Sequence, residues 1–364
     1  MSYARARLYL GISCVGMWVM LACVTLVFKL PSRFLSADET WSLYDASQLI
    51  TVVFIYAFVQ GVFDLFGGFV LPREYGRYVP NLTGFLKRLV KAVFVHSLLL
   101  VLISLSLITA SRLGGFWVTL LVFIGISLVL ISTQLPLSRL VGSFAVTRKD
   151  KHLYINSSFT HVTGGIAGLF KSTAVIPAFW QKTFSADQLQ ILIKRREKVA
   201  KRGSRHLGLA AALLWNVLGF SLAYLVAGGL QNVASFVTFS LYSTLWAFLG
   251  VLSLPTLSRR AVFQADALIS ETEEKRILAD ILPKLDQLQD NEYRRGQLVE
   301  SVFHPIPSVA RRLDKLASSS TPVLAPWHLA RTVLYLSWAN VSLLSRAVHC
   351  NIGRPEVWVF LPSD

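Results

Sequence analysis

The stretch from Leu207 to Ser258 places the strongest constraint on the fold of this chain. It runs for 52 residues without an Asp, Glu, Lys or Arg. One membrane-spanning helix needs about 20 predominantly apolar residues, so this stretch is too long for one span and fits two. Turn-forming residues at 227–232 divide it near its middle. The sequence therefore predicts a helical hairpin that returns its flanking polar segments, 189–198 and 262–270, to the same membrane face.

Four further uncharged runs predict spans in the first part of the chain. The mean hydropathy of +0.54 and the 15% share of charged residues exclude a soluble domain. Each run is expected to be helical, because hydrocarbon cannot satisfy free backbone groups. The first run is too long for a secretory signal and lacks a cleavage site, so we expect a retained span. The runs are 8–28, 46–63 with a continuation to 71, 92–111 and 113–138, which gives six predicted spans in total.

Basic residues gather in alternate loops of this predicted topology. They concentrate at 5–7, 73–91, 139–151 and 259–260, whereas the other loops are mixed or nearly uncharged. Because Lys and Arg favour the cytoplasmic side, we expect both termini and both polar segments in the cytoplasm, at a bacterial inner membrane. The net charge of +16 then reflects topology and attraction to the lipid bilayer. No nucleic-acid partner is expected, because no recognition motif accompanies the charge.

The fold class that follows is an α-helical polytopic membrane protein with a cytoplasmic α+β domain. Short strands are predicted at 153–155 and 174–176, on either side of a turn-rich patch at 163–168. Ser185 and Gln188 have the spacing of a capping box, which predicts the start of a helix.

The end of the chain follows a predicted linker at 318–322. Residues 327–348 are predicted to form an amphipathic surface helix, with a seventh span as the alternative, and 357–361 a strand or docked extension. The expected domains are 1–138 with four transmembrane helices, 139–206 as a first cytoplasmic segment, 207–258 as the hairpin, 259–320 as a cytoplasmic helical segment and 321–364 as amphipathic helix and tail.

An ordered set of motifs carries a resemblance to a known family. A helix introduced by residues 184–189 precedes the hairpin, 258–266 follows it, and His304-Pro305 and Arg311-Arg312-Leu313 come later. In this order they resemble the integral-membrane zinc metallopeptidases of the HtpX and CAAX-prenyl-protease type, over about residues 150–316. The resemblance implies a gluzincin-like domain. Its first helix would carry HExxH, and the helix after the hairpin would carry a glutamate ligand in E-x-x-A-D.

The two histidine ligands of such a site are missing. HExxH binds zinc because histidines at i and i+4 share one helix face, while the glutamate takes a proton from bound water. No histidine of this chain is followed by glutamate. Aligned on Glu197, Arg196 and Ala200 stand at the histidine positions; shifted by one residue, Arg195 and Val199 stand there.

The third ligand is missing as well, because Val262 stands where E-x-x-A-D requires glutamate. Asp266 remains; the resemblance implies that it orients a ligand histidine. An arginine stays protonated and repels a metal cation, so we expect no zinc and no other cofactor. The candidates for a vestigial site are Arg195, Arg196, Glu197 and Asp266, and the lost ligand positions are Arg196, Ala200 and Val262.

The other cytoplasmic histidines lack the short spacing of a zinc site and are interpreted as packed or surface residues. They are His161, His206, His304 and His349 with its neighbour Cys350. The resemblance also implies that the turn at 164–168 edges a substrate cleft.

Asp64 is the only formal charge inside a predicted span. A proton or ion pathway is one interpretation. The favoured one is a hydrogen-bonded carboxylate near the interface, beside the small pair Gly67-Gly68.

Three functional hypotheses follow. The favoured one is a catalytically inactive peptidase homologue that binds membrane proteins or peptide segments, or regulates an active relative. Arg195, Arg196 and Lys198 would then supply fixed positive charge in place of zinc. The first alternative is an active membrane peptidase with an atypical site, such as Glu197 with His206 or His304. The second is a small-molecule or ion transporter that uses Asp64.

Overall fold

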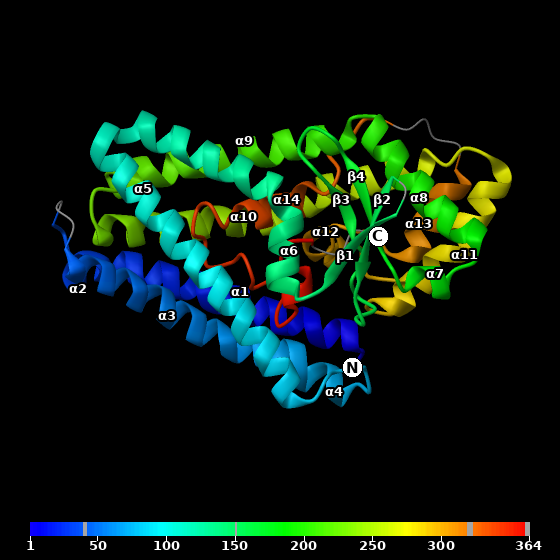
Figure 1. Cartoon of the computed structure of the whole chain (residues 1–364), viewed down its shortest axis with the longest axis horizontal. Helices are drawn as coiled ribbons and strands as arrows, with labels where there is room; N and C mark the ends of the chain where they lie inside the picture. Colours follow the sequence, from blue (N-terminus) through cyan, green and yellow to red (C-terminus); the bar gives the residue numbers. More distant parts are fainter. Residues whose placement is uncertain (39–41, 150, 319–322, 361–364) are drawn as a thin grey trace.

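The structure is a computed structural model that describes residues 1–38, 42–149, 151–318 and 323–360. Long helices lie side by side over most of its length, and a small sheet with shorter helices lies at one end (Figure 1). Most of the predicted linker (319–322) and the last residues of the predicted tail (361–364) lie outside the described residues. The long-helix part contains α1 Tyr3–Val27, α2 Leu30–Phe34, α3 Leu43–Leu65, the π-helical turn Phe66–Val70, α4 Leu71–Glu74, α5 Leu82–Ser132, α6 Gln134–Gly142, α9 Ser204–Ala227 and α10 Val233–Ala267.

Among the described residues, five helical stretches are long and apolar enough to cross a membrane: α1, residues 43–74, α5, α9 and α10. Each predicted run begins inside one of them. α5 is bent at Gly114 and Gly115, where the backbone is not helical. The chain folds back there (Figure 1), so the two arms of α5 cover the third run and most of the fourth. The protein is therefore an integral membrane protein, while the number of bilayer crossings and their orientation stay predictions.

The uncharged stretch forms the helical hairpin that its length predicted. α9 ends at Gly228 and Gly229, whose φ angles of +74° and +103° suit glycine, and Asn232 caps the start of α10. The two helices pack through aromatic rings, among them Phe220 and Phe239 with centroids 5.3 Å apart. The hairpin therefore carries the polar ends of α9 and α10 to the same end of the molecule (Figure 1).

The sheet and the shorter helices form a region that we call the polar lobe, residues 145–201 and 268–318. Its strands have the order β1-β2-β4-β3; β2 and β4 are parallel, and the outer pairings are antiparallel. β2 and β4 contain the two predicted strand segments, whereas β1 and β3 were not predicted. The elements are β1 Ala145–Lys149, β2 His152–Asn156, β3 Gly165–Ala167, β4 Thr173–Pro177, α7 Trp180–Thr183, α8 Ala186–Lys201, α11 Thr272–Leu288, α12 Gln297–Phe303 and α13 Val309–Ala317.

The lobe has an apolar core of its own. Ile176 of β4, Leu192 of α8 and Leu282 of α11 are buried in one cluster that also includes Trp180. Burial of such side chains is the main force that holds the helices on the sheet. α8 is thereby fixed between the sheet, α11 and the end of α10.

The prediction of an amphipathic surface helix over 327–348 was wrong, and a seventh span is not formed either. Helix α14 covers only Leu329–Leu336, and the chain continues in turns to a short 3-10 helix at Pro355–Val357. Most residues from 325 to 360 are buried, and the others are partly buried. This part, residues 323–360, is called the C-terminal segment, and it runs through the middle of the long-helix part (Figure 1).

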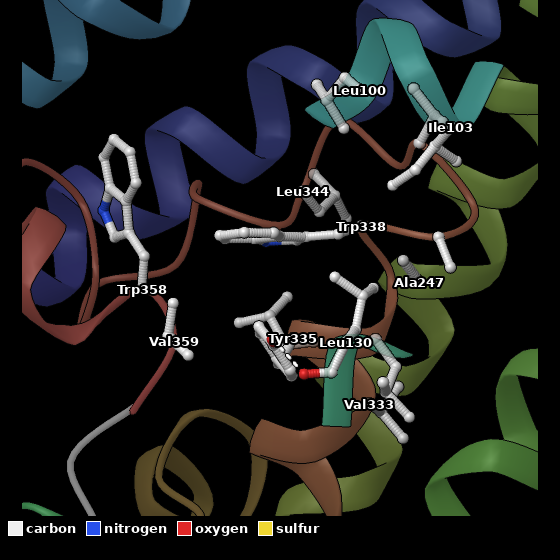
Figure 2. Packing of buried hydrophobic residues seen from close by; sticks show 14 of the residues in the cluster. Leu100, Ile103, Leu130, Ala247, Val333, Tyr335, Trp338, Leu344, Trp358 and Val359 are labelled. Atoms are coloured by element: carbon white, nitrogen blue, oxygen red, sulfur yellow. Dashed lines mark hydrogen bonds between the residues drawn. The ribbon is translucent and has the colours of Figure 1, made fainter. Parts of the chain in front are cut away.

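The C-terminal segment fills the interior with aromatic and aliphatic side chains. Trp338 and Leu344 lie beside Leu100 and Ile103 of α5 (Figure 2), and Tyr335 donates a hydrogen bond to the backbone oxygen of Leu130 at 2.8 Å. The polar backbone groups of the C-terminal segment also form hydrogen bonds with the spans. Ser240 of α10 donates to the backbone oxygen of Val341 at 2.6 Å, and Thr244 accepts from the Leu343 amide at 3.1 Å. Such bonds let irregular backbone lie inside a helical bundle.

Charged side chains of the spans hold the far half of the segment. Asp64 accepts a hydrogen bond from the Gly353 amide at 2.8 Å and lies 3.6 Å from the guanidinium of Arg346, with both side chains fully buried. Arg7 of α1 donates to the backbone oxygens of His349 and Ile352. These contacts support the interpretation of Asp64 as a hydrogen-bonded structural carboxylate. Its side chain ties the C-terminal segment to the first spans.

Candidate functional site

The helix at the expected HExxH position is α8, and its start agrees with the predicted capping box of Ser185 and Gln188. Arg195, Arg196 and Val199 are buried on the side that faces the protein. Side chains at i and i+4 share a helix face, so Arg195 and Val199 point the same way.

Arg195 and Asp266 are joined across the hairpin. Nε of Arg195 donates to Oδ1 of Asp266 at 2.8 Å. Arg312 of α13 donates to the same carboxylate through two nitrogens, at 2.8 and 2.9 Å. All three side chains are almost completely buried. Two guanidiniums therefore donate to one buried carboxylate, and such charge-assisted hydrogen bonds are among the strong ones.

Arg196 faces the sheet and not Asp266. It donates to the backbone oxygen of Val175 at 2.7 Å and to that of Thr163 at 2.6 Å. Its guanidinium carbon also lies 4.8 Å from the ring centre of Trp180. Arg196 therefore ties α8 to β4 and to the turn before β3.

Glu197 and Lys198 contact partners other than Asp266. Glu197 is 40% exposed, and its carboxylate lies 3.7 Å from Nε2 of His152. Lys198 donates at 2.7 Å to the backbone oxygen of Leu268 at the end of α10, where a cation favours the helix dipole. Of the four vestigial-site candidates, the structure joins only Arg195 and Asp266 by a direct side-chain contact.

The positions of Val199 and Val262 meet in one apolar cluster. Both side chains are buried with Ile166 of β3, and Ala325 and Trp327 of the C-terminal segment belong to the same cluster. The Trp327 ring also lies 5.2 Å from the guanidinium carbon of Arg195. The C-terminal segment therefore occupies the space between α8, α10 and the edge strand β3.

These residues do not fit a zinc ion. Arg195, Val199 and Val262 offer no lone pair for a metal, and the guanidinium of Arg195 carries a permanent positive charge. The other register fails as well, because Arg196 is bonded to the sheet and Ala200 has no donor atom. Among the described residues, no three His, Cys, Asp or Glu side chains converge as metal ligands.

Three of the histidines considered as metal ligands line a single small cavity of about 50 Å³ between the polar lobe and the C-terminal segment. His161 bonds to Glu356 at 2.7 Å, and the rings of His304 and His349 lie 4.9 Å apart. Burial, together with the charge of Arg354, lowers the pKa of His161 to about 4, so its neutral ring donates to the carboxylate. His206 is exposed on α9. The residues of this polar cavity include His161, Asp286, Asp290, Arg295, His304, Arg312, Arg331, His349, Cys350 and Arg354.

Sequence reasoning did not assign roles to Arg312 or Trp327. Arg312 belongs to the motif Arg311-Arg312-Leu313. It lies on α13 and Asp266 lies on α10, and nothing in the sequence indicates that the two side chains meet. Trp327 lay in the part predicted to form a surface helix. Both residues are distant from the site in sequence, and only the tertiary fold brings them into contact with it.

The fold is similar to that of the crystal structure of S. mikatae Ste24p. The TM-score is 0.63 at 15% sequence identity, and the match covers 83% of this chain and 80% of that one. No protein-family model matches the chain, and no curated protein sequence matches it. At this identity the likeness establishes the fold alone. It supports the fold that the order of motifs indicated.

Proposed function

We propose that this protein is a catalytically inactive homologue of the membrane metallopeptidases, of a degenerate HtpX or CAAX-prenyl-protease type. It acts as a binding or regulatory module at the membrane face that carries the polar lobe. The contact that carries this proposal is the buried bond between Arg195 and Asp266, supported by Arg312. In this interpretation Arg195 and Val199 occupy the positions of the two histidine ligands, and Val262 occupies that of the glutamate.

The buried charge supports the loss of metal chemistry. Asp266 is already satisfied by two guanidiniums, and Arg195 places a fixed cation where the resemblance implies Zn²⁺. A second cation there would meet strong repulsion in a buried site. Hydrolysis through a metal-bound water has no ligand set to support it.

The filled cleft supports the same conclusion. Ala325 and Trp327 pack on Val199, Val262 and Ile166, in the space that a peptide would need beside β3. Partners would therefore bind the outside of the lobe and spans, as membrane proteins or exposed peptide segments, and an active relative would be regulated through such contacts.

The proposal is tested by metal analysis and a proteolysis assay on the full chain purified in detergent. We expect zinc far below stoichiometry by inductively coupled plasma mass spectrometry, and no cleavage of casein or of an unfolded membrane protein. Glu197→Gln, the variant of the atypical-site alternative, should give the same background. Stoichiometric zinc with chelator-sensitive cleavage, or cleavage lost in Glu197→Gln, would establish an active peptidase.

A further inference from the structure

Among its described residues, the polar lobe exposes large apolar side chains in only two short segments. One is the turn between β3 and β4, which carries Phe170, and the other runs into α12 and carries Tyr293, Leu298 and Val299. Phe170 is 92% exposed and Leu298 is 82% exposed. Apolar side chains that gather at particular places on a surface mark a contact with another surface.

The turn between β3 and β4 is held at the ends of α5 and α9. Arg205 donates to the backbone oxygen of Gly168 in this turn and to Oε1 of Gln134, both at 3.3 Å. Arg205 comes two residues before Leu207, where the uncharged stretch begins, and Gln134 follows the end of α5. Basic residues at the ends of apolar spans mark the level of the lipid headgroups. The exposed ring of Phe170 therefore lies close to that level.

The segment that runs into α12 is held at the ends of α1 and α10. The carboxylate of Glu292 lies 3.6 Å from the guanidinium of Arg5, which precedes the apolar run of α1. The carboxylate of Glu300 lies 3.7 Å from Arg259, the first charged residue after the uncharged stretch. Glu300 is buried, whereas Leu298, two positions earlier on the helix, faces outward. Leu298 is therefore also exposed near the level of the headgroups.

We propose that Phe170 and Leu298 enter the lipid leaflet that adjoins the polar lobe and tie the lobe to the bilayer surface beside its own spans. Bilayer lipid is the apolar material around the spans at this level. An exposed basic residue accompanies each side chain, because Lys171 follows Phe170 and Arg294 lies in the segment before α12. Apolar side chains combined with basic ones are typical of segments that lie in the interface of a membrane.

The two contacts together fix the orientation of the lobe on the membrane. They lie at different pairs of spans, α5 with α9 and α1 with α10. The contact of Phe170 also holds β3, the edge strand that packs on the C-terminal segment, close to the bilayer. The proposal is independent of whether the site around Arg195 is active.

The first test is photocrosslinking of the full chain in nanodiscs of phosphatidylcholine with a fraction of phosphatidylglycerol. The photoreactive residue p-benzoylphenylalanine replaces Phe170 or Leu298 in separate variants, and lipid adducts are measured by mass spectrometry. Leu214, which is 59% exposed and lies inside the uncharged stretch, is the positive control. Glu273 is the negative control, because its side chain is 66% exposed on α11, at the end of the lobe far from the long helices (Figure 1).

Insertion of a large apolar side chain is favoured about tenfold or more over its exposure to water. We therefore expect lipid adducts at Phe170 and at Leu298 to exceed those at Glu273 by about tenfold or more and to approach those at Leu214. Adducts at the Glu273 level at either position, or adducts with another protein chain in place of lipid, would overturn the proposal.

The second test uses natural side chains, because the photoreactive residue is itself apolar. Phe170→Ser should accelerate amide hydrogen exchange over residues 165–177 several-fold in the same nanodiscs. Phe170→Trp should keep the exchange of wild type, because Trp also favours the membrane interface. Thermal unfolding shows that each variant is folded, which is expected for substitutions at exposed positions. Equal exchange in Phe170→Ser and wild type would likewise overturn the proposal.

Discussion

Arg195 of α8 and Asp266 of α10 are 71 positions apart in the chain and share a buried hydrogen bond of 2.8 Å. The membrane hairpin lies between them in sequence, so this bond fixes the relative position of the two helices that enter and leave the hairpin. Arg312 completes the contact from a third helix. These hydrogen bonds hold the polar lobe in a fixed position at the ends of the spans.

Removing the Asp266 carboxylate should destabilise the protein strongly. Asp266→Asn removes the charge of the carboxylate to which two buried guanidiniums donate, and breaking a buried ion pair costs about 3–5 kcal/mol. A large drop in the thermal unfolding temperature in detergent is the expected result. Glu273→Gln is the control, because Glu273 and its partner Arg276 are mostly exposed and should contribute little. Equal stability of the two variants would contradict this account of the site.

Restoring the ligands should distinguish the two possible registers. The variant with Arg195→His, Val199→His and Val262→Glu is expected to gain stoichiometric zinc, because Val199 and Val262 meet in one cluster and Arg195 lies beside Asp266. The control with Arg196→His, Ala200→His and Val262→Glu should not, because Arg196 faces the sheet. Metal analysis after gel filtration measures both; zinc in the control variant alone would reverse the assignment of positions.

The bonds from Arg196 to the sheet should depend on the forked shape of its side chain. Arg196→Lys keeps the charge, but a single ammonium cannot reproduce the two bonds to Val175 and Thr163. Loss of one such charged bond costs about 1.5–3 kcal/mol. Hydrogen exchange over residues 163–177 should accelerate, and unchanged exchange would argue against the contact. Arg276→Lys, at an exposed position of α11, should leave that exchange unchanged.

Close backbone approach at Gly68 should make this position intolerant of a methyl group. A Cβ added there would lie 2.0 Å from the backbone oxygen of Gly353, whereas one added at Gly61 meets no atom within 4 Å. Gly68→Ala should therefore destabilise the protein by about 1–3 kcal/mol or more and expose the C-terminal segment to trypsin. Gly61→Ala is the matched control. Equal resistance to trypsin in both variants would show that the segment is not held at Gly68.

Acid should weaken the packing around the polar cavity. Burial lowers the pKa of His161 to about 4 and holds that of His304 well below its usual value. The unfolded imidazoles titrate near 6.5. As pH falls below about 6.5, the imidazoles of the unfolded chain therefore take up protons before those of the folded protein. The stability contributed by the neutral rings is lost as pH falls from about 6.5 toward the pKa values of the folded state.

The measurement is the thermal unfolding temperature between pH 7.5 and 5. It should fall in wild type and fall less in His161→Gln. Burial raises the pKa of Asp286 to about 6. The stability that its protonated carboxyl group contributes at low pH is lost as pH rises through that value, so Asp286 opposes the trend set by the histidines. Asp286→Asn should therefore steepen the loss on acidification. A profile that rises on acidification would contradict the neutral state of the two histidines.

The sequence was sufficient for the features that depend on a whole segment. The absence of charge from Leu207 to Ser258 requires two membrane helices wherever the rest of the chain lies. The capping box at Ser185 is likewise a local feature. The order of motifs was enough to indicate the fold that the structural comparison supports.

The finer features depend on contacts that the sequence does not show. Arg195 and Arg196 are neighbours, and only the rotation of α8 against α10 and the sheet decides which of them meets Asp266. Residues 327–348 have the apolar spacing of a surface helix. Inside the bundle, however, hydrogen bonds from side chains such as Ser240 allow turns where an isolated segment would need a helix. The prediction was wrong there because the partners of the backbone groups lie about a hundred residues away.

The position of the C-terminal segment has a consequence for how the protein is made. The residues that fill the centre of the bundle leave the ribosome after all the spans around them. Until Arg346 and Gly353 arrive, Asp64 lacks the partners that satisfy it in the finished fold. The spans therefore cannot reach their final packing until the C-terminal segment has also been made.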